Sequence, residues 1–437
     1  MNVIRGTPTS SSVQRIYLIL LLGNTLAASL IWGINTIFLL DAGLSNLEAF
    51  AANAFFTGGM VVFEIPTGIV ADTVGRRASY LLGTVSLAGS TLLYVLLWRI
   101  NGPFWAWALV SMLIGLGFTF FSGAVDAWLV DALQATGFEG NLESVFGKGQ
   151  VVTGAAMLTG SVAGGYIAQL TSLGVPFVLR AVVLVVMFAI AFAFMRDIGF
   201  TPVQGEGLVR GVKRISGASL QYGWRVPAVK WIMLASPFTA GVGIYAFYAL
   251  QPYLLQLRGN PTAYGIAGLV AAIVAGAQIV GGFAAPWIRK LFHRRTSALF
   301  AATAASAVTL ALIGVADRFW AVVGLIVVWA LLFAASAPIH SAYLNGLIPS
   351  QQRATILSFD SMIGSSGGVV VQPVLGRAAD VWGYAGSYVL GAGISAFALP
   401  FVLLARREGV PADTATGGGM PEQPVGGSTP ELAPEKP

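Results

Sequence analysis

The sequence predicts an all-α integral membrane protein with twelve transmembrane helices in two pseudo-symmetric six-helix bundles. Three observations predict this fold class: an apolar composition, twelve apolar runs of membrane-spanning length, and a repeat of the first half of the chain in the second. Apolar residues make up 56% of the 437 positions and charged residues 10%, whereas soluble chains have about 45–50% and about 25%. The mean hydropathy of +0.78 fits a chain that lies mostly in lipid.

This composition excludes several classes of protein. A water-soluble globule is excluded because 42 charged side chains are too few to cover the surface of so long a chain. The absence of cysteine excludes disulfides, a thiolate nucleophile and a Cys-ligated metal. The net charge of +6 comes from basic residues in short loops rather than from a basic stripe, so we expect a lipid bilayer and no nucleic acid as partner.

The membrane spans are the apolar runs. A run of about 20 residues crosses the hydrocarbon core as a helix. The twelve expected spans are 16–40, 47–71, 79–98, 104–131, 145–170, 176–195, 231–255, 262–288, 297–315, 319–347, 354–376 and 384–405. The first run is longer than the about 7–15 residues of a signal peptide, so we expect it to remain in the mature chain. The expected units are an N-terminal segment 1–15, bundles 16–195 and 231–405, a central loop 196–230 and a tail 406–437.

The orientation follows from the basic residues. An even number of spans places both termini on one side, and the loops of that side hold 19 Lys and Arg residues against 4 on the other. The positive-inside rule then makes both termini cytoplasmic. Arg180 is left over near the outer end of the sixth span. Arginine outnumbers lysine 19 to 5, which is typical of GC-rich bacterial genomes and therefore favours the plasma membrane.

Two segments are expected outside the membrane. In the loop 196–230, Leu208, Val212 and Ile215 recur at helical spacing among basic residues. This pattern fits a basic amphipathic helix on the inner leaflet and equally a solvated linker that carries topology charges. The tail from Arg406 is rich in glycine and proline, so we expect it to be disordered.

An internal repeat joins the two halves. Arg76 falls on Arg294 at an offset of 218, and Asp126 falls on His340 at an offset of 214. The matches keep their order while the offset falls to 211 at the end of the repeat. Parallel repeats with a binding site between the halves are a transporter design.

The loop after the second span carries a family resemblance. The chain reads Gly68-Ile-Val-Ala-Asp72-Thr-Val-Gly75-Arg76-Arg77 there, which resembles the signature loop of the major facilitator superfamily (MFS). The twelve spans and the repeat extend the resemblance over nearly the whole membrane region. It implies two bundles that rock about a central cavity lined by spans 1, 2, 4 and 5 and by spans 7, 8, 10 and 11.

The same loop is expected to form an inner gate. Gly68 permits close helix packing and Gly75 a tight turn, while Asp72 is expected near the positive N-terminal pole of the eleventh span. Arg77 is expected to reach Asp131. The gate set is therefore Gly68, Asp72, Gly75, Arg76, Arg77 and Asp131. The alternative is that the two arginines only fix topology.

A second resemblance concerns the fifth span. Its glycines resemble the glycine-rich signature of drug/proton antiporters, with Gly154, Gly160, Gly164 and Gly165 in place and Ala163 where a proline is expected. The resemblance favours export.

Ionisable residues inside the spans are the candidates for proton coupling. Such residues are costly in a membrane and functional by default. Glu64, Asp126 and His340 lie at similar depth on the cytoplasmic side of their spans. Asp126 is the first candidate, because a closed cavity favours the protonated carboxyl and a hydrated one the carboxylate. The alternatives are structural hydrogen bonds for the carboxylates and packing for His340, while Asp131 and Asp360 are expected to serve helix ends.

The candidate substrate contacts are polar or aromatic residues of the same spans. They are Trp32, Asn35, Asn53, Tyr245, Gln251 and Gln278. Because no Lys or Arg lies near the middle of a span, anions are expected to be poor substrates, and amphiphilic or weakly cationic compounds are favoured.

The sequence therefore predicts a proton-coupled exporter of small amphiphilic compounds, with a nutrient importer of the same fold as the alternative. Only His293 and His340 are available as histidine ligands or bases, which disfavours an integral-membrane enzyme. No ATP-binding glycine-rich loop occurs, so the energy source is expected to be a proton gradient without a cofactor. We expect a monomer.

Overall fold

The computed structural model describes residues 9–202, 224–348 and 353–414, and in these residues all regular secondary structure is helical. The helices are α1 Ser10–Trp32, α2 Asn35–Asp41, α3 Asn46–Thr73, α4 Arg76–Ile100, α5 Phe104–Thr119, α6 Ala124–Ala135, α7 Leu142–Leu170, α8 Gly174–Phe194, α10 Pro227–Arg258, α11 Tyr264–Lys290, α12 Arg295–Val315, α13 Phe319–Asn345, α14 Arg353–Ala396 and α15 Ala398–Arg407. Eleven helical segments among the described residues are long and apolar enough to cross a membrane. The last of them turns back at Gly383 (φ 71°, ψ 173°), so it forms two spans and completes the expected twelve.

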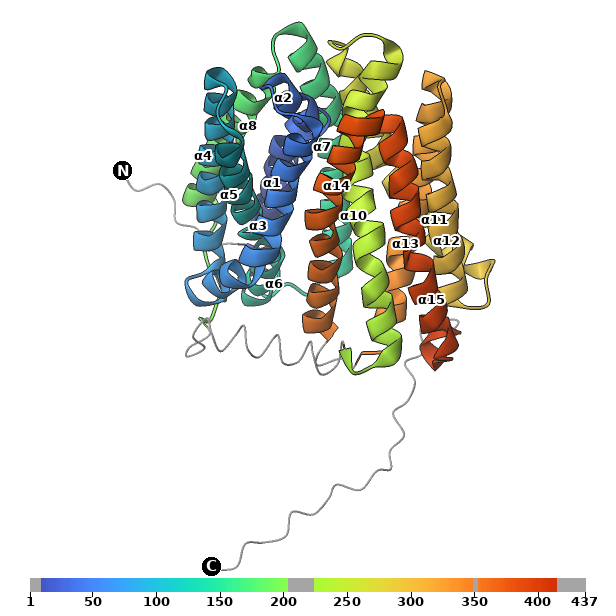
Figure 1. Ribbon diagram of the computed structural model, residues 1–437. Helices are drawn as coiled ribbons and strands as arrows, with labels where there is room; N and C mark the ends of the chain where they lie inside the picture. The colour runs from blue at the N-terminus through green and yellow to red at the C-terminus, as the bar shows by residue number, and fades with distance from the viewer. Residues whose placement is uncertain (1–8, 203–223, 349–352, 415–437) are drawn as a thin grey trace, which may run out of the picture.

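The helices form two bundles that pack in the same way. Helices α1 to α8 make the first bundle and α10 to α15 the second, side by side (Figure 1). In the first bundle α1 packs on α7 and α3 on α5, and in the second α10 packs on α14 and α11 on α13. The two pairings join equivalent spans, which confirms the pseudo-symmetric fold. The helix expected around Leu208, Val212 and Ile215 lies outside the described residues.

Both described chain ends lie on one face of the protein, here called the terminal face; the opposite one is the far face. Ser10 at the start of α1 donates its hydroxyl proton to Thr136 Oγ1 at 3.1 Å, in the loop between α6 and α7. At the other end of the chain, Asp413 binds the start of α12.

The first span is broken where a continuous helix was expected. Helix α1 stops at Trp32, and a Cβ on Gly33 would approach Gly268 Cα of the second bundle to 2.8 Å. Inside a membrane, backbone groups freed by a break need new partners. Gln251 supplies them: its amide donates to the Trp32 carbonyl oxygen at 2.7 Å and accepts from the Thr36 N–H at 3.0 Å.

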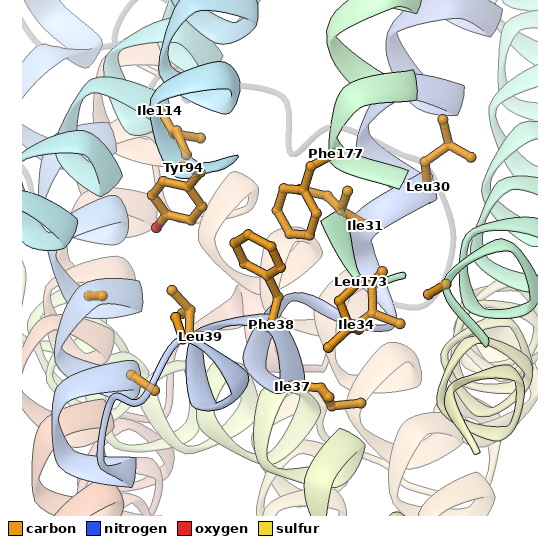
Figure 2. Packing of buried hydrophobic residues seen from close by; sticks show 14 of the residues in the cluster. Leu30, Ile31, Ile34, Ile37, Phe38, Leu39, Tyr94, Ile114, Leu173 and Phe177 are labelled. Carbon is orange, nitrogen blue, oxygen red and sulfur yellow. The ribbon is translucent and has the colours of Figure 1, made fainter. Parts of the chain in front are cut away.

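After the break, α2 covers the first bundle on the far face. Phe38 of α2 is fully buried and stacks on Phe177 of α8, with ring centroids 4.0 Å apart. Figure 2 shows these two rings next to each other, with Ile31 and Leu173 beside them. This apolar cluster closes the far end of the bundle. It includes Tyr94, which also lines the cavity described below.

The fourth span, expected to be continuous over 104–131, is also broken. Helix α5 ends at Thr119 and α6 begins at Ala124, after Gly123 at φ 68°. Ser79 donates its hydroxyl proton to the freed Phe120 carbonyl oxygen at 2.8 Å. The break places the N-terminal pole of α6 inside the bundle, next to the acidic residues of the site.

After the last span of each bundle, an aspartate forms a hydrogen bond with the first turn of the third span of the same bundle. Asp197 accepts a hydrogen bond from the Arg77 N–H at 2.9 Å in the first turn of α4. Asp413 accepts from the N–H and from the hydroxyl of Thr296 in α12, both at 2.8 Å, and is only 2% exposed. The tail expected to be disordered from Arg406 is therefore folded as far as residue 414, because Asp413 neutralises the N-terminal pole of a helix.

Replacing Asp413 by alanine should lower the free energy of unfolding by about 1–3 kcal/mol, because a buried N–H loses its acceptor. Thermal unfolding of the purified protein in detergent measures this effect. Asp317→Ala is the matched control, since Asp317 is exposed in the loop at the other end of α12. Equal melting temperatures for the Asp413→Ala protein and the native protein would show that the tail does not stabilise the bundle.

Candidate functional site

A cavity of about 330 Å³ lies at the centre of the molecule, against the first bundle. Trp32, Asn35 and Asn53, all expected substrate contacts, line it together. The second bundle contributes Tyr248 of α10. The remaining wall is mostly apolar or aromatic, as the sequence indicates.

The two asparagines supply the neutral polar groups of the cavity. Asn35 donates its amide proton to Asn53 Oδ1 at 3.0 Å. The Nδ2 atom of Asn53 is buried and has no hydrogen-bond partner in the part of the chain that the structure describes. It is a donor that a ligand in the cavity can use.

Three other expected contact residues lie elsewhere. Tyr245 is buried in the second bundle and donates its hydroxyl proton to Ser387 Oγ at 2.6 Å. Gln251 fills the break of the first span, and Gln278 does not line the cavity. The helical register explains the first difference, because Tyr248, three residues along α10, takes the cavity position instead.

Arg180 of α8 also lines the cavity, so the expectation of a cavity without a cation is wrong. The side chain is 3% exposed, and its guanidinium carbon lies 5.6 Å from the centroid of the Phe118 ring. Sequence position alone placed this residue near the end of a span. The side chain is long, and α8 directs it inward, which the hydropathy of the span does not reveal.

Glu64 and Asp126, the expected proton carriers of the first bundle, lie on its terminal side. Glu64 of α3 accepts a hydrogen bond from the Ser122 hydroxyl at 2.6 Å. Asp126, in the first turn of α6, accepts one from the Tyr17 hydroxyl at 3.0 Å and is exposed. The N-terminal pole of α6 stabilises negative charge on Asp126. The broken fourth span thus connects two carboxylates, each paired with a hydroxyl donor.

His340 pairs with Asp360 in the second bundle. Their Nε2 and Oδ2 atoms are 2.8 Å apart, and Asp360 also accepts from the Ser236 hydroxyl at 3.2 Å. Both residues line a second cavity of about 310 Å³ that is rich in hydroxyl groups. The sequence interpretation assigned Asp360 to a helix end; its position inside a cavity-lining span was the signal for a site residue.

The loop after the second span is held by ion pairs different from those expected. Arg76 binds Asp72 at 2.5 Å, and its Nε lies 3.9 Å from Asp131 Oδ2. Arg77, expected to reach Asp131, instead donates to the Phe192 carbonyl oxygen at 2.6 Å. The expected Arg77 contact is therefore wrong, because α4 presents Arg76, one residue earlier, toward α6.

The two glycines of the loop differ in what they do. Gly75 has φ 128°, and a Cβ there would collide with the Asp197 carboxylate, so this position requires glycine. At Gly68 a Cβ would meet no heavy atom within 4 Å among the described residues. The close helix approach expected at Gly68 is absent from this conformation.

The two bundles meet on the far side of the cavity. Asp380 accepts hydrogen bonds from the N–H groups of Asn46 and Leu47, at 3.0 and 2.9 Å, at the start of α3. Gln169 accepts from the Gly265 N–H at 2.9 Å. Within residues 9–202, 224–348 and 353–414, the hydrogen bonds between the bundles lie at mid-membrane or beyond it toward the far face. The cavity is closed toward the far face.

The family model described as Major Facilitator Superfamily matches residues 17–292. The chain belongs to the major facilitator superfamily. It is a multi-pass secondary transporter, and family and fold are those of transporters rather than enzymes.

The chain is similar to a curated bacterial protein and to solved transporter structures. The uncharacterized MFS-type transporter YxaM of Bacillus subtilis (strain 168) is 24% identical over 346 residues, which cover 76% of this chain and 80% of YxaM. A crystal structure of a mutant of the nucleoside transporter NupG superposes with a TM-score of 0.73 at 11% identity, covering 90% of this chain and 99% of the other. The crystal structure of a bacterial homologue of the human lysosomal transporter Spinster, inward-facing and unoccupied, superposes with a TM-score of 0.69 at 14% identity. The match covers 94% of this chain and 100% of the other. The similarity to the two structures shows the fold.

The glycines of the fifth span have a packing role in this MFS protein. A Cβ on Gly160 would collide with Ser29, and one on Gly164 with the Leu30 carbonyl oxygen, both in α1. A Cβ on Gly165 would lie 2.6 Å from the Tyr264 carbonyl oxygen and 2.9 Å from Gly268 Cα, both in α11. The glycines let α7 contact the first span and the opposite bundle at once.

Proposed function

We propose that this MFS protein is a proton-coupled antiporter that exports small amphiphilic compounds by alternating access. The observation that carries the proposal is the position of Glu64 and Asp126. Glu64 lies one turn of α3 from Met60, which lines the central cavity, and Asp126 is exposed on the terminal side, toward which the cavity is not closed. By the distribution of basic residues the terminal face is cytoplasmic and the membrane is the bacterial plasma membrane. The protein works as a monomer.

In this state the substrate enters from the cytoplasm. Its apolar part contacts Trp32 and its polar groups contact Asn35 and Asn53, which line the cavity. Outward release requires the far contacts to break and the terminal ends to approach. Because the fold has closely packed interfaces at the far side, the change is a switch between two discrete packings.

Two carboxylates at opposite ends of the spans, Asp380 and Asp72, are assigned to the two gates. Asp380, at the far end of its span, binds the N-terminal pole of α3 and holds the far gate closed. Asp72 lies at the terminal end of α3 and is about half exposed, paired with Arg76. In the outward-open state Asp72 takes the corresponding position at the N-terminal pole of α14. Each carboxylate therefore stabilises one of the two states.

Asp380→Asn should favour outward-open states and Asp72→Asn inward-open states, each by about 0.3–2 kcal/mol, because each loses a charge at a helix pole. A single cysteine in place of Asn35, in this cysteine-free chain, reports access to the cavity from either side. Opposite changes in its labelling by an impermeant reagent are expected. Identical labelling in both variants contradicts the assignment of the two gates.

Transport in proteoliposomes with an imposed pH gradient tests the proposed function. A panel of amphiphilic compounds should move against their gradients when protons move the other way, in the direction from the terminal to the far face. Cysteines at Arg407 and Asn101 fix the orientation in cells: the first should be shielded from an outside reagent and the second should react. Substrate movement in the same direction as protons would instead show a nutrient importer.

A further inference from the structure

The buried guanidinium of Arg180 carries a positive charge at the cavity that no described residue balances. It makes no hydrogen bond or ion pair with any residue that the structure describes, and its Nε is fully buried. Its polar neighbours are the hydroxyl groups of Tyr94 and Tyr248, neither of which carries a charge at neutral pH. The guanidinium remains protonated in proteins. A full positive charge therefore faces the cavity without a counter-charge from the described part of the chain.

Such a charge is costly for a membrane protein to keep. Ionisable residues in spans normally pair with one another or with backbone carbonyls, or else they belong to the site that binds a ligand. Arg180 rests on the Phe118 ring, which contributes a cation–π contact but no charge. The missing counter-charge must then come from a molecule that enters the cavity.

We propose that the cavity binds a small organic anion whose carboxylate or phosphate group is held by Arg180. The guanidinium fork suits either oxyanion, since both offer two acceptor oxygens in one plane. Asn53 Nδ2 adds a neutral donor in the same cavity. Trp32, Phe56 and Met60 form an apolar wall for the rest of the molecule, and a cavity of about 330 Å³ accepts a small compound rather than a lipid.

This inference rests on the proposed function and names its substrate class. It replaces weakly cationic compounds, which Arg180 repels, by amphiphilic acids. The electric field of a membrane that is negative inside also favours the export of an anion. The charge of the cavity and the direction of transport therefore agree.

Binding to the purified full-length protein tests the proposal without a proton gradient, so a failure of proton coupling does not affect the result. The probes are benzoate and phenyl phosphate, which separate the two oxyanions, with benzyl alcohol and benzylamine as neutral and cationic analogues. Isothermal titration should show binding of at least one anion, and about tenfold or more weaker binding of the alcohol and the amine.

Arg180→Gln should reduce the affinity for the bound anion about tenfold to a hundredfold, and Arg180→Lys, which keeps the charge without the fork, should reduce it less. Arg258→Gln is the matched control, because Arg258 lies over the Phe319 ring at the same 5.6 Å but is exposed outside the cavity. Without ligand, Arg180→Gln should melt no lower than the native protein, since it removes an unpaired charge.

Three results would overturn the proposal. One is the absence of binding of both anions to the native protein. The second is equal affinity of the native protein and the Arg180→Gln variant for the anion. The third is a lower melting temperature of ligand-free Arg180→Gln together with unchanged anion binding by Arg180→Lys, which would make Arg180 a structural residue.

Discussion

Replacing Asp126 by asparagine should abolish proton-driven accumulation of substrate while leaving substrate binding intact. A gradient of one pH unit is worth about 1.4 kcal/mol, which sustains about a tenfold concentration ratio for each coupled proton. Asparagine keeps the size of the side chain and can accept from the Tyr17 hydroxyl, but it cannot carry a proton. The ratio reached in proteoliposomes with the Asp126→Asn protein should therefore fall to about one.

One control variant and one control measurement make this result specific. Glu143→Gln removes an exposed carboxylate in the first turn of α7, outside the site and the gate, and it should keep the uphill ratio. Exchange of labelled substrate without a pH gradient should continue in the Asp126→Asn protein. If that protein concentrates substrate as well as the native protein does, Asp126 is not the proton carrier, and Glu64→Gln becomes the next variant to measure.

The spans were predictable because burial in lipid leaves a direct record in hydropathy. The two breaks were not, since the runs around Gly33 and Gly123 are still apolar enough to be interpreted as continuous spans. Their causes lie in other parts of the chain: Gly268 approaches the first break, and Gln251 satisfies the backbone groups it frees. The hydrophobic periodicity of one sequence gives no information about such long-range contacts.

Only part of the candidate site was predictable from the sequence. Asn35 and Asn53 line one cavity, and both were predicted because they are polar residues within the expected cavity-lining spans. Arg180 was assigned by its distance from the end of a span, although the direction of its side chain decides its role. The docking of Asp413 depends on one residue in a segment whose composition is that of a disordered tail.

Gly268→Leu should strongly slow transport by opposing closure of the far gate. Three glycines of three spans meet there: a Cβ on Gly268 would collide with the Ser161 carbonyl oxygen and lie 2.9 Å from Gly165 Cα, while Gly33 approaches from α1. Backbone atoms cannot rotate away as a side chain can, so the bundles must separate. Overpacking of this kind costs about 1–3 kcal/mol, which shifts the balance toward outward-open states about fivefold to more than a hundredfold.

Gly276→Leu provides a control on the same helix, two turns further along α11. A Cβ at Gly276 makes only an ordinary contact, with Leu158 Cδ2 at 3.9 Å, so this variant should transport normally. Labelling of a single cysteine at Asn35 from the far side should rise in the Gly268→Leu protein and stay at the native level in the Gly276→Leu protein. Equal labelling in the two variants, or native transport rates in Gly268→Leu, would mean that the three glycines do not form the far gate, and the hydrogen bonds of Gln251 and Asp380 would then have to hold it closed.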